Sequence, residues 1–167
     1  MRFYKITNED ECHNGLQYHD GLNVDLVPWY PHGSCQPGGI YFSREDILAF
    51  IDHGPWIREV TLPPDARVYK DPREPHKWKA DKVILGPRRK IDVDVVRELI
   101  AEGADIHVCE DWSLRIAAAR GHTKIVRMLL DADADVHACE DEALREAEAY
   151  GHTKIVAMLQ EAVNAQR

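Results

Sequence analysis

Apolar residues in the C-terminal part of the chain recur at helical spacing. Two apolar stripes follow one another, the first at Leu114, Ala117 and Ala118 and the second at Ile125, Val126, Leu129 and Leu130. An apolar position every three or four residues predicts an amphipathic helix. Gly121 lies between the stripes, where a helix end favours a left-handed residue. The pattern therefore predicts two short helices joined by a glycine turn.

The same pattern occurs again 30 residues further along the chain. The hexapeptide GHTKIV at Gly121–Val126 returns at Gly151–Val156, and GADIHVCED at Gly103–Asp111 aligns with Asp133–Asp141. Identical residues at a fixed interval are the sequence signature of a repeat array. The C-terminal part is therefore expected to consist of stacked helical units.

Repeated polar residues are interpreted as parts of this scaffold. The acidic pairs Glu110-Asp111 and Glu140-Asp141 are expected to cap the first helix of each unit, because carboxylates are favoured at helix N-termini. Four repeated histidines are expected to make structural hydrogen bonds and not to be catalytic or ligating groups: His107, His122, His137 and His152.

Residues 1–88 show a different pattern, in which short runs rich in β-branched and aromatic residues alternate with turns. Strands are expected at RFYKIT, GGIYFS, WIREVTLP, ARVYKD and DKVILGP. The loop-rich segment 9–39 is expected to contain one more strand. The run REDILAFIDHG predicts a helix capped by Ser43. These elements indicate a small α+β domain.

The repeats resemble the ankyrin repeat. The resemblance rests on Ala-x-x-x-Gly-His at Ala117–His122 and Ala147–His152, on Ile-Val-x-x-Leu-Leu, and on Gly-Ala-Asp at 103–105. The Thr-Pro-Leu-His segment is replaced by EDWSLR and EDEALR, so the connections between repeats should be short. The resemblance implies about two and a half repeats in residues 89–167. The predicted fold is therefore an α+β N-terminal domain followed by a short all-α ankyrin-like helical repeat stack.

The N-terminal domain also resembles a known type. Its segments HNGLQYHDGLN, GSCQPGGIYFS, REVTLP and KWKADKVILG are similar to the domain that precedes ankyrin-type repeats in proteins of giant DNA viruses of the mimivirus type. The resemblance implies a viral protein directed at a host factor. The four cysteines form no CxxC pair, which fits a reducing, intracellular setting such as the host cytoplasm.

The negative charge of the chain is concentrated in the repeats. Residues 91–167 contain 8 Lys and Arg against 16 Asp and Glu, which accounts for the whole net charge of −8. This balance argues against general nucleic-acid binding. Residues 67–90 form a basic run that includes Tyr69 and Trp78, which we interpret as a solvated face. We expect a protein partner, with a basic host protein as the candidate, and no membrane contact.

Residues that differ between equivalent positions of the two units are the expected partner contacts, because shared residues maintain the scaffold. Trp112 and Tyr150 stand out, since aromatic residues dominate interface energetics. Trp112 has an alternative role as a core contact with the N-terminal domain. The expected partner-binding residues are Trp112, Ser113, Ile116, Arg120, Glu142, Glu146 and Tyr150.

The loop-rich segment is a candidate metal site. Five side chains of the types that bind zinc fall within 24 residues: Cys12, His13, His19, His32 and Cys35. Two of them are adjacent and the other gaps fit no zinc motif. The sequence therefore predicts no metal and no cofactor.

An enzymatic alternative rests on the strand GGIYFS, which resembles the second core strand of ADP-ribosyltransferases. Tyr41 would be the tyrosine that stacks on nicotinamide, with Arg2 on the first strand and Glu59 as the catalytic glutamate. Only the tyrosine motif matches clearly, and a function must be argued from a complete site. The favoured interpretation is a non-catalytic protein–protein interaction protein, with an ADP-ribosyltransferase-like enzyme as the alternative.

Overall fold

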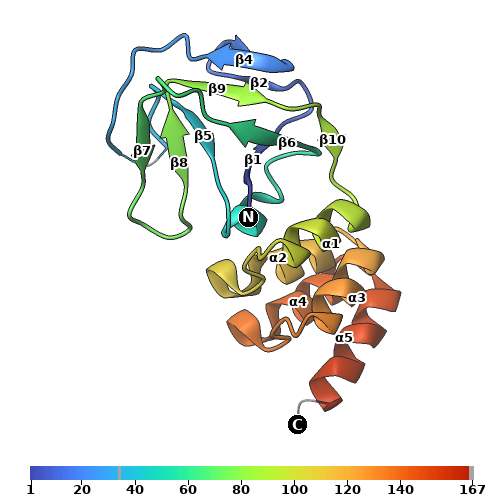
Figure 1. Cartoon of the computed structure of the whole chain (residues 1–167). Helices are drawn as coiled ribbons and strands as arrows, with labels where there is room; N and C mark the ends of the chain where they lie inside the picture. Colours follow the sequence, from blue (N-terminus) through green and yellow to red (C-terminus); the bar gives the residue numbers. More distant parts are fainter. Residues whose placement is uncertain (34, 166–167) are drawn as a thin grey trace. The chain divides into compact units, whose positions relative to one another are not determined.

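The computed structural model of the chain describes residues 1–33 and 35–165 (Figure 1). A sheet-rich N-terminal region is followed by five α-helices. Two compact units are formed, one by Met1–Ile91 with Glu102–Ala104 and the other by Asp92–Ala101 with Asp105–Arg167.

The N-terminal region is built from antiparallel strands in three sheets. The largest sheet has the order β1 (Phe3–Thr7), β6 (Trp56–Thr61), β9 (Lys82–Leu85) and β4 (Gly21–Val24), and β10 (Arg89–Lys90) also pairs with β6. The second sheet has the order β5 (Ile40–Phe42), β8 (Trp78–Ala80) and β7 (Val68–Lys70). A two-stranded sheet joins β2 (Cys12–His13) and β3 (Leu16–Gln17).

Among the described residues, apolar side chains from these sheets form a hydrophobic core. It contains Leu16, Tyr18, Ile40, Phe42, Val60, Ala80, Val83 and Leu85. Val60 on β6 and Val83 and Leu85 on β9 alternate with exposed or half-buried residues, as a sheet with one buried face requires. The burial of this apolar surface is what holds the two larger sheets together.

A buried ion pair between Arg58 and Glu11 connects the loop-rich segment 9–39 to strand β6. The guanidinium of Arg58 on β6 donates to both carboxylate oxygens of Glu11, at 2.7 and 3.0 Å, and to the carbonyl of Gly86 at 2.7 Å. The side chains of Arg58 and Glu11 are only 4% and 6% exposed. The hydrogen bond from Arg58 lowers the pKa of Glu11. Asp20 adds a third acceptor for Arg58 at 2.6 Å.

The prediction of a helix after Ser43 is wrong in the length of the helix and in its cap. Only a short 3₁₀-helix forms, η1 (Ile47–Phe50), and no side chain caps it. The hydroxyl of Ser43 donates instead to the carbonyl of His76 at 2.7 Å, while the backbone of Ser43 pairs with Tyr4. The carboxylate of Asp46 accepts the backbone N–H of His76 at 2.5 Å. Long-range partners therefore take the groups that a local cap would use.

Strand β8 was not predicted, because its sequence WKA lies in the basic run. Lys79 at its centre is completely buried, and its ammonium donates to the carbonyl of His32 at 3.0 Å. Trp78 packs edge to face on Phe3, with ring centroids 5.2 Å apart. The interpretation of this run as a solvated face is therefore wrong at β8.

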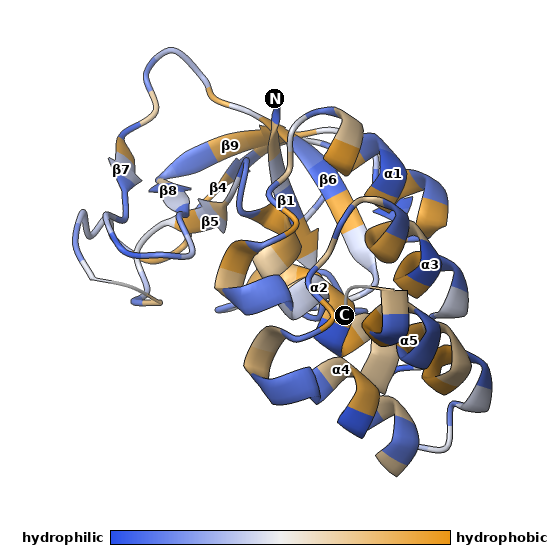
Figure 2. Ribbon diagram, turned by 90° about the horizontal axis from the view of Figure 1, so that it is seen from below, coloured by the Kyte–Doolittle hydropathy of each residue, from blue (hydrophilic) through white to orange (hydrophobic). Residues whose placement is uncertain are grey.

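The five helices form two rows. One row is α1 (Val93–Ala101), α3 (Thr123–Asp131) and α5 (Thr153–Ala165), and the other is α2 (Val108–Ala119) and α4 (Ala138–Ala149). Apolar and polar residues alternate around each helix, as the orange and blue ribbon segments show (Figure 2). The described connections between these helices contain no strand. No helix in residues 1–33 and 35–165 has the length and apolar character needed to cross a membrane.

The glycine turns form as predicted. Gly121 has φ +76° and Gly151 has φ +72°. The N–H of His122 bonds to the carbonyl of Ala117 at 2.9 Å, a Schellman-type closure that satisfies the end of the first helix. The ring of His152 lies against Gly121, and its Nε2 lies 3.0 Å from the carbonyl oxygen of Ala119 in the preceding repeat. This confirms that His152 is a structural hydrogen-bonding residue.

The prediction that the acidic pairs cap helices is wrong. In α2, Cys109, Glu110 and Asp111 all have left-handed backbone angles, with φ of 53°, 56° and 54°. The same turn recurs in α4 at residues 139–141. Three consecutive left-handed residues other than glycine are strained, at about 1–2 kcal/mol each. Side chains hold the turn in place: Asp111 lies 3.2 Å from the ring Nδ1 of His107, and Arg115 donates to the carbonyl of Cys109 at 3.3 Å.

The two turn glycines offer a matched test of repeat packing. A Cβ added to Gly121 would lie 2.8 Å from the ring of His152, whereas a Cβ on Gly151 would meet nothing within 4 Å. Gly151→Ala should lower the free energy of unfolding by about 1 kcal/mol, because of its positive φ alone. Gly121→Ala should lose about 1–3 kcal/mol more through the displaced histidine. Denaturant unfolding of both variants measures the difference, and equal losses would contradict this packing.

The Arg58–Glu11 pair predicts a specific acid sensitivity. Because the pKa of Glu11 is lowered in the folded chain, the pair stabilises the fold above the unfolded glutamate pKa of about 4.3. That stability is lost as pH falls through the folded pKa of Glu11. Arg58→Met should lower the free energy of unfolding by about 3 kcal/mol at pH 7 and flatten its dependence on acid pH.

The exposed ion pair between Arg97 and Asp94 supplies the control for this variant. Arg97→Met should change the free energy of unfolding by at most about 0.5 kcal/mol. Urea titrations at several pH values compare the two variants. A wild-type-like acid profile for Arg58→Met would contradict the assignment.

Candidate functional site

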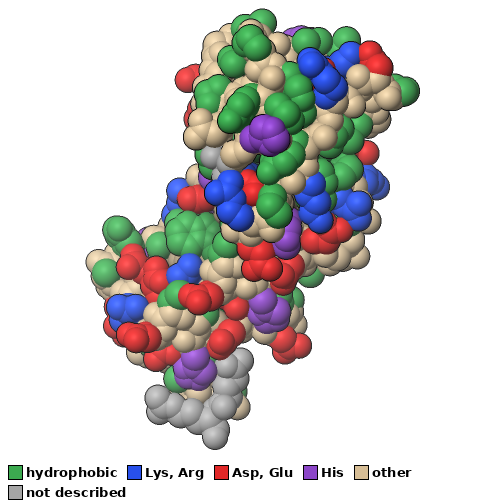
Figure 3. Space-filling view, turned by 90° about the vertical axis from the view of Figure 1, so that its left-hand side faces the viewer, with side chains coloured by type: hydrophobic (Ala, Val, Ile, Leu, Met, Phe, Trp, Pro, Cys, Tyr) green, Lys and Arg blue, Asp and Glu red, His purple; other side chains and the backbone are tan. Residues whose placement is uncertain are grey.

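The residues expected to contact a partner lie on α2, on α4 and at their C-terminal ends. Arg120 and Tyr150 are exposed at equivalent positions, immediately after the two helices. Trp112, Ile116, Glu142 and Glu146 are half-buried. Acidic side chains gather on the surface of the helical unit, as the space-filling view shows (Figure 3).

Ser113 does not belong to this surface. Ser113 is completely buried, and its hydroxyl has no hydrogen-bond partner among the described residues. Ala143, the equivalent residue of the next repeat, is buried as well. The position is therefore an interior position of the stack, and the expectation that Ser113 contacts a partner is wrong.

Arg115 links two of the expected contact residues, and sequence reasoning missed it. Its guanidinium lies over the ring of Trp112, 5.0 Å from the centroid, and donates to Glu142 of the next repeat at 2.7 Å. Arg145 is the equivalent residue of the next repeat, and a comparison that looks for residues differing between repeats does not select a shared one. Both arginines bond to the carbonyl of a left-handed turn, but only Arg115 has a following repeat to pair with among the described residues.

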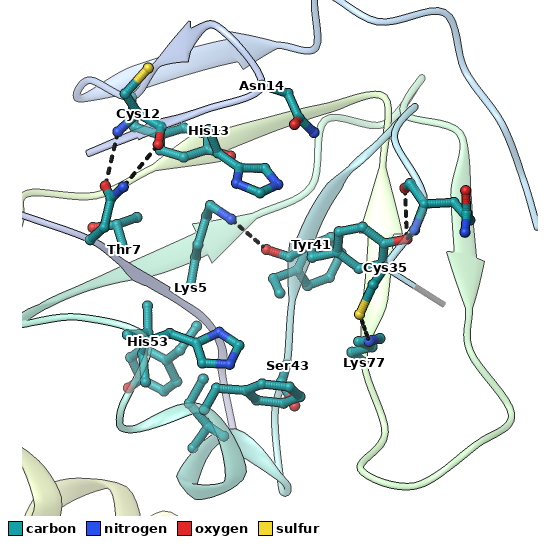
Figure 4. Close-up of a pocket in the computed structure, with 18 residues that line it drawn as sticks. Lys5, Thr7, Cys12, His13, Asn14, Cys35, Tyr41, Ser43, His53 and Lys77 are labelled. Atoms are coloured by element: carbon teal, nitrogen blue, oxygen red, sulfur yellow. Dashed lines mark hydrogen bonds between the residues drawn. The ribbon is translucent and has the colours of Figure 1, made fainter. Parts of the chain in front are cut away.

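A second candidate site lies within the N-terminal region, as a cavity of about 330 Å³. Residues from β1, β2 and β5 line it, together with residues around η1 (Figure 4). Its basic lining residues are Lys5, His13, His53 and Lys77. No carboxylate is found among the described residues that line it.

Lys5 is the buried cation of this cavity. Its ammonium donates to the carbonyl of Tyr41 at 2.9 Å and lies 4.6 Å from the ring centroid of Tyr18. Burial lowers the pKa of Lys5 from 10.5 to about 8, and the charge of Asp25 opposes part of this change. Partial burial lowers the pKa of His13, and the charge of Lys5 lowers it further.

The enzymatic alternative needs three residues that the structure does not bring together. Tyr41 lines the cavity, but Arg2 and Glu59 do not. Those two residues form an ion pair with each other at 3.3 Å. The ring of Tyr41 has the ammonium groups of Lys77 and Lys79 over it, at 5.3 and 5.4 Å from the centroid. These cations occupy the ring that would have to stack on nicotinamide.

The side chains weighed as zinc ligands have other contacts. The Sγ of Cys35 accepts a hydrogen bond from Lys77 at 2.9 Å, and the Nδ1 of His19 lies 2.8 Å from the carbonyl oxygen of Asp20. Across the described parts of the chain, no group of three or more His, Cys, Asp or Glu side chains is placed to hold a metal ion.

Comparison with known proteins supports the repeat assignment. Residues 88–166 match the family model for ankyrin repeats in three copies. A putative ankyrin repeat protein of Acanthamoeba polyphaga mimivirus is 40% identical over 135 residues, which cover 72% of this chain and 44% of that protein. An uncharacterized protein of the same virus is 38% identical over 128 residues, covering 74% of this chain and 93% of that protein.

A third relative, another putative ankyrin repeat protein of this virus, is 34% identical over 130 residues and is covered over 63% of its length. The chain thus spans less than two thirds of both ankyrin-named relatives. No solved structure matches it. The chain belongs to the ankyrin-repeat proteins of the mimivirus type. Ankyrin repeats present extended surfaces for protein recognition.

Lys5 gives the cavity a measurable electrostatic signature. Between pH 8 and 10.5 the unfolded chain binds more protons at Lys5 than the folded chain, so wild-type stability rises with pH there. Lys5→Met should remove this rise and increase the free energy of unfolding at pH 7 by about 1–3 kcal/mol. The free energy of unfolding of both proteins, measured between pH 7 and about 9.5, tests this expectation. Tyrosines titrate above this range. An unchanged rise in the variant would contradict the buried ammonium.

Proposed function

We propose that this chain is a non-catalytic binding protein that engages a host factor through the α2–α4 row of its repeats. In this proposal an α+β domain at residues 1–88 precedes the ankyrin-like stack at residues 89–167, and the protein acts in the host cytoplasm. The observation that carries the proposal is Tyr150, a 65% exposed aromatic residue at the end of α4. Exposed aromatic side chains are frequent anchors of protein interfaces.

The charges around Tyr150 favour a basic partner. Glu142 and Glu146 lie on the same helix, in a part of the chain that carries the entire net charge of −8. Complementary charge accelerates association and orients the partner. Ankyrin-type surfaces bind extended partners along their inner helices, so Arg120 at the end of α2 belongs to the same surface.

Trp112 and Ile116 complete the proposed surface on α2. The guanidinium of Arg115 covers one part of the Trp112 ring and connects it to Glu142 across the repeat boundary. A partner that contacts Trp112 would therefore meet an element held by two repeats. Such preorganised contacts lower the entropic cost of binding.

Quantitative capture from candidate host lysate tests this proposal with the full chain. Tyr150→Ala and Glu146→Gln should each reduce capture of the partner several-fold, as expected for an aromatic anchor and a steering charge. Arg127→Ala, at an exposed position of α3 in the other row, is the matched control and should leave capture unchanged. Raising NaCl from about 0.05 to 0.5 M should weaken binding, because the Debye length shortens.

Three results would overturn the proposal. They are capture that resists salt, capture lost equally in Arg127→Ala, and capture that persists when Tyr150 and Glu146 are both replaced. The last result would move the binding surface away from the α2–α4 row.

A further inference from the structure

The cavity of the N-terminal region collects positive charge in a chain that is negative overall. Lys5, His13, His53 and Lys77 line it, and its remaining polar lining consists of neutral groups such as Asn14 and Ser43. The carboxylate of Asp25 influences Lys5 but does not line the cavity; it accepts backbone N–H groups at 2.6 and 3.2 Å. No carboxylate among the described lining residues balances the charge of the two lysines.

Lys5, His13 and His53 converge on one part of this space. Figure 4 shows the two imidazole rings on either side of the Lys5 side chain. Their charges interact, because both Lys5 and His53 lower the pKa of His13. Among the described residues, the Lys5 ammonium donates one hydrogen bond, to Tyr41. An ammonium has three protons to donate, so two remain for a ligand.

We propose that this cavity binds a small organic phosphate, with Lys5, His13 and His53 facing the phosphate group. A phosphate offers several acceptor oxygens and can receive hydrogen bonds from three directions, and charge-assisted hydrogen bonds of this kind are strong. The volume of about 330 Å³ falls within the usual range of small-molecule sites. Ile47 and Phe50 provide apolar walls for the organic part of the ligand.

The phosphate would relieve the electrostatic repulsion that Lys5 and His53 exert on His13. Its two negative charges balance those of Lys5 and Lys77, the two lysines of the lining. A monocarboxylate would neutralise only one of them. The repeats play no part in this site, which is a binding activity separate from partner recognition.

The proposal makes a pH prediction with a definite sign. The pKa of Lys5 is about 8, so its ammonium is lost as pH rises from 7 to 9. A phosphate monoester titrates near pH 6 and stays a dianion over this range. Phosphate binding should therefore weaken between pH 7 and 9. The other titratable groups that line the cavity are Tyr4, Cys12, His13, Tyr18, Cys35, Tyr41, His53 and Lys77, and the charge of Asp25 also acts on Lys5.

Isothermal titration calorimetry of the full chain with adenosine monophosphate, inorganic phosphate and acetate tests the proposal. Adenosine monophosphate should bind one to one and more tightly than inorganic phosphate, and acetate should not compete. Lys5→Met should weaken adenosine monophosphate binding at least about tenfold, the effect of losing one charged hydrogen bond. Lys124→Met, at an exposed lysine of α3, should bind as the wild type does.

His53→Gln at the exposed rim gives an independent test should Lys5→Met fail to fold. It should also weaken adenosine monophosphate binding while the far-ultraviolet spectrum stays unchanged. Binding of neither phosphate at millimolar concentration would overturn the proposal, as would full affinity in both variants. Acetate that binds as tightly as phosphate would replace the phosphate class with a carboxylate.

Discussion

Each helical repeat satisfies polar groups that its neighbour leaves open, and the stack depends on this exchange. The Nε2 of His152 lies 3.0 Å from the carbonyl oxygen of Ala119, and Asp111 accepts the N–H of Asp135 at 2.9 Å. Glu142 does the same for Arg115. An unpaired buried polar group costs about 1–3 kcal/mol. The repeats are therefore stable in one register, and the 30-residue period of the sequence corresponds to that register.

The sequence alone predicted those parts of the fold that depend on local patterns. The helical stripes and the glycine at position 121 could be inferred because a helix and its Schellman-type end involve neighbouring residues. The strands Phe3–Thr7 and Trp56–Thr61 were recognisable from their β-branched and aromatic content. Tyr150 was predicted to be exposed because it differs from the equivalent residue of the other repeat, and it is exposed.

The remaining features depend on distant partners and left no local signal. Ser43 looks like a helix cap, yet its hydroxyl bonds to His76. Lys79 looks like a surface residue, but the carbonyl of His32 satisfies its ammonium inside the domain. Lys5 also looks like a surface residue but is buried, because its strand pairs with a strand that is distant in the sequence. A cavity lined by such residues could not be predicted from spacing.

The contacts between repeats and the pairing of distant strands also form at different times. Repeat contacts join residues close in sequence, whereas Phe3 of β1 pairs with Val60 of β6. Folding is slower when contacts lie far apart along the chain. During synthesis β1 leaves the ribosome before β6, so their ladder can form only after Thr61 has emerged, and β10 pairs with β6 only after Lys90 has emerged. The order of translation thus leaves β1 without its β6 partner while the residues between the two strands are made.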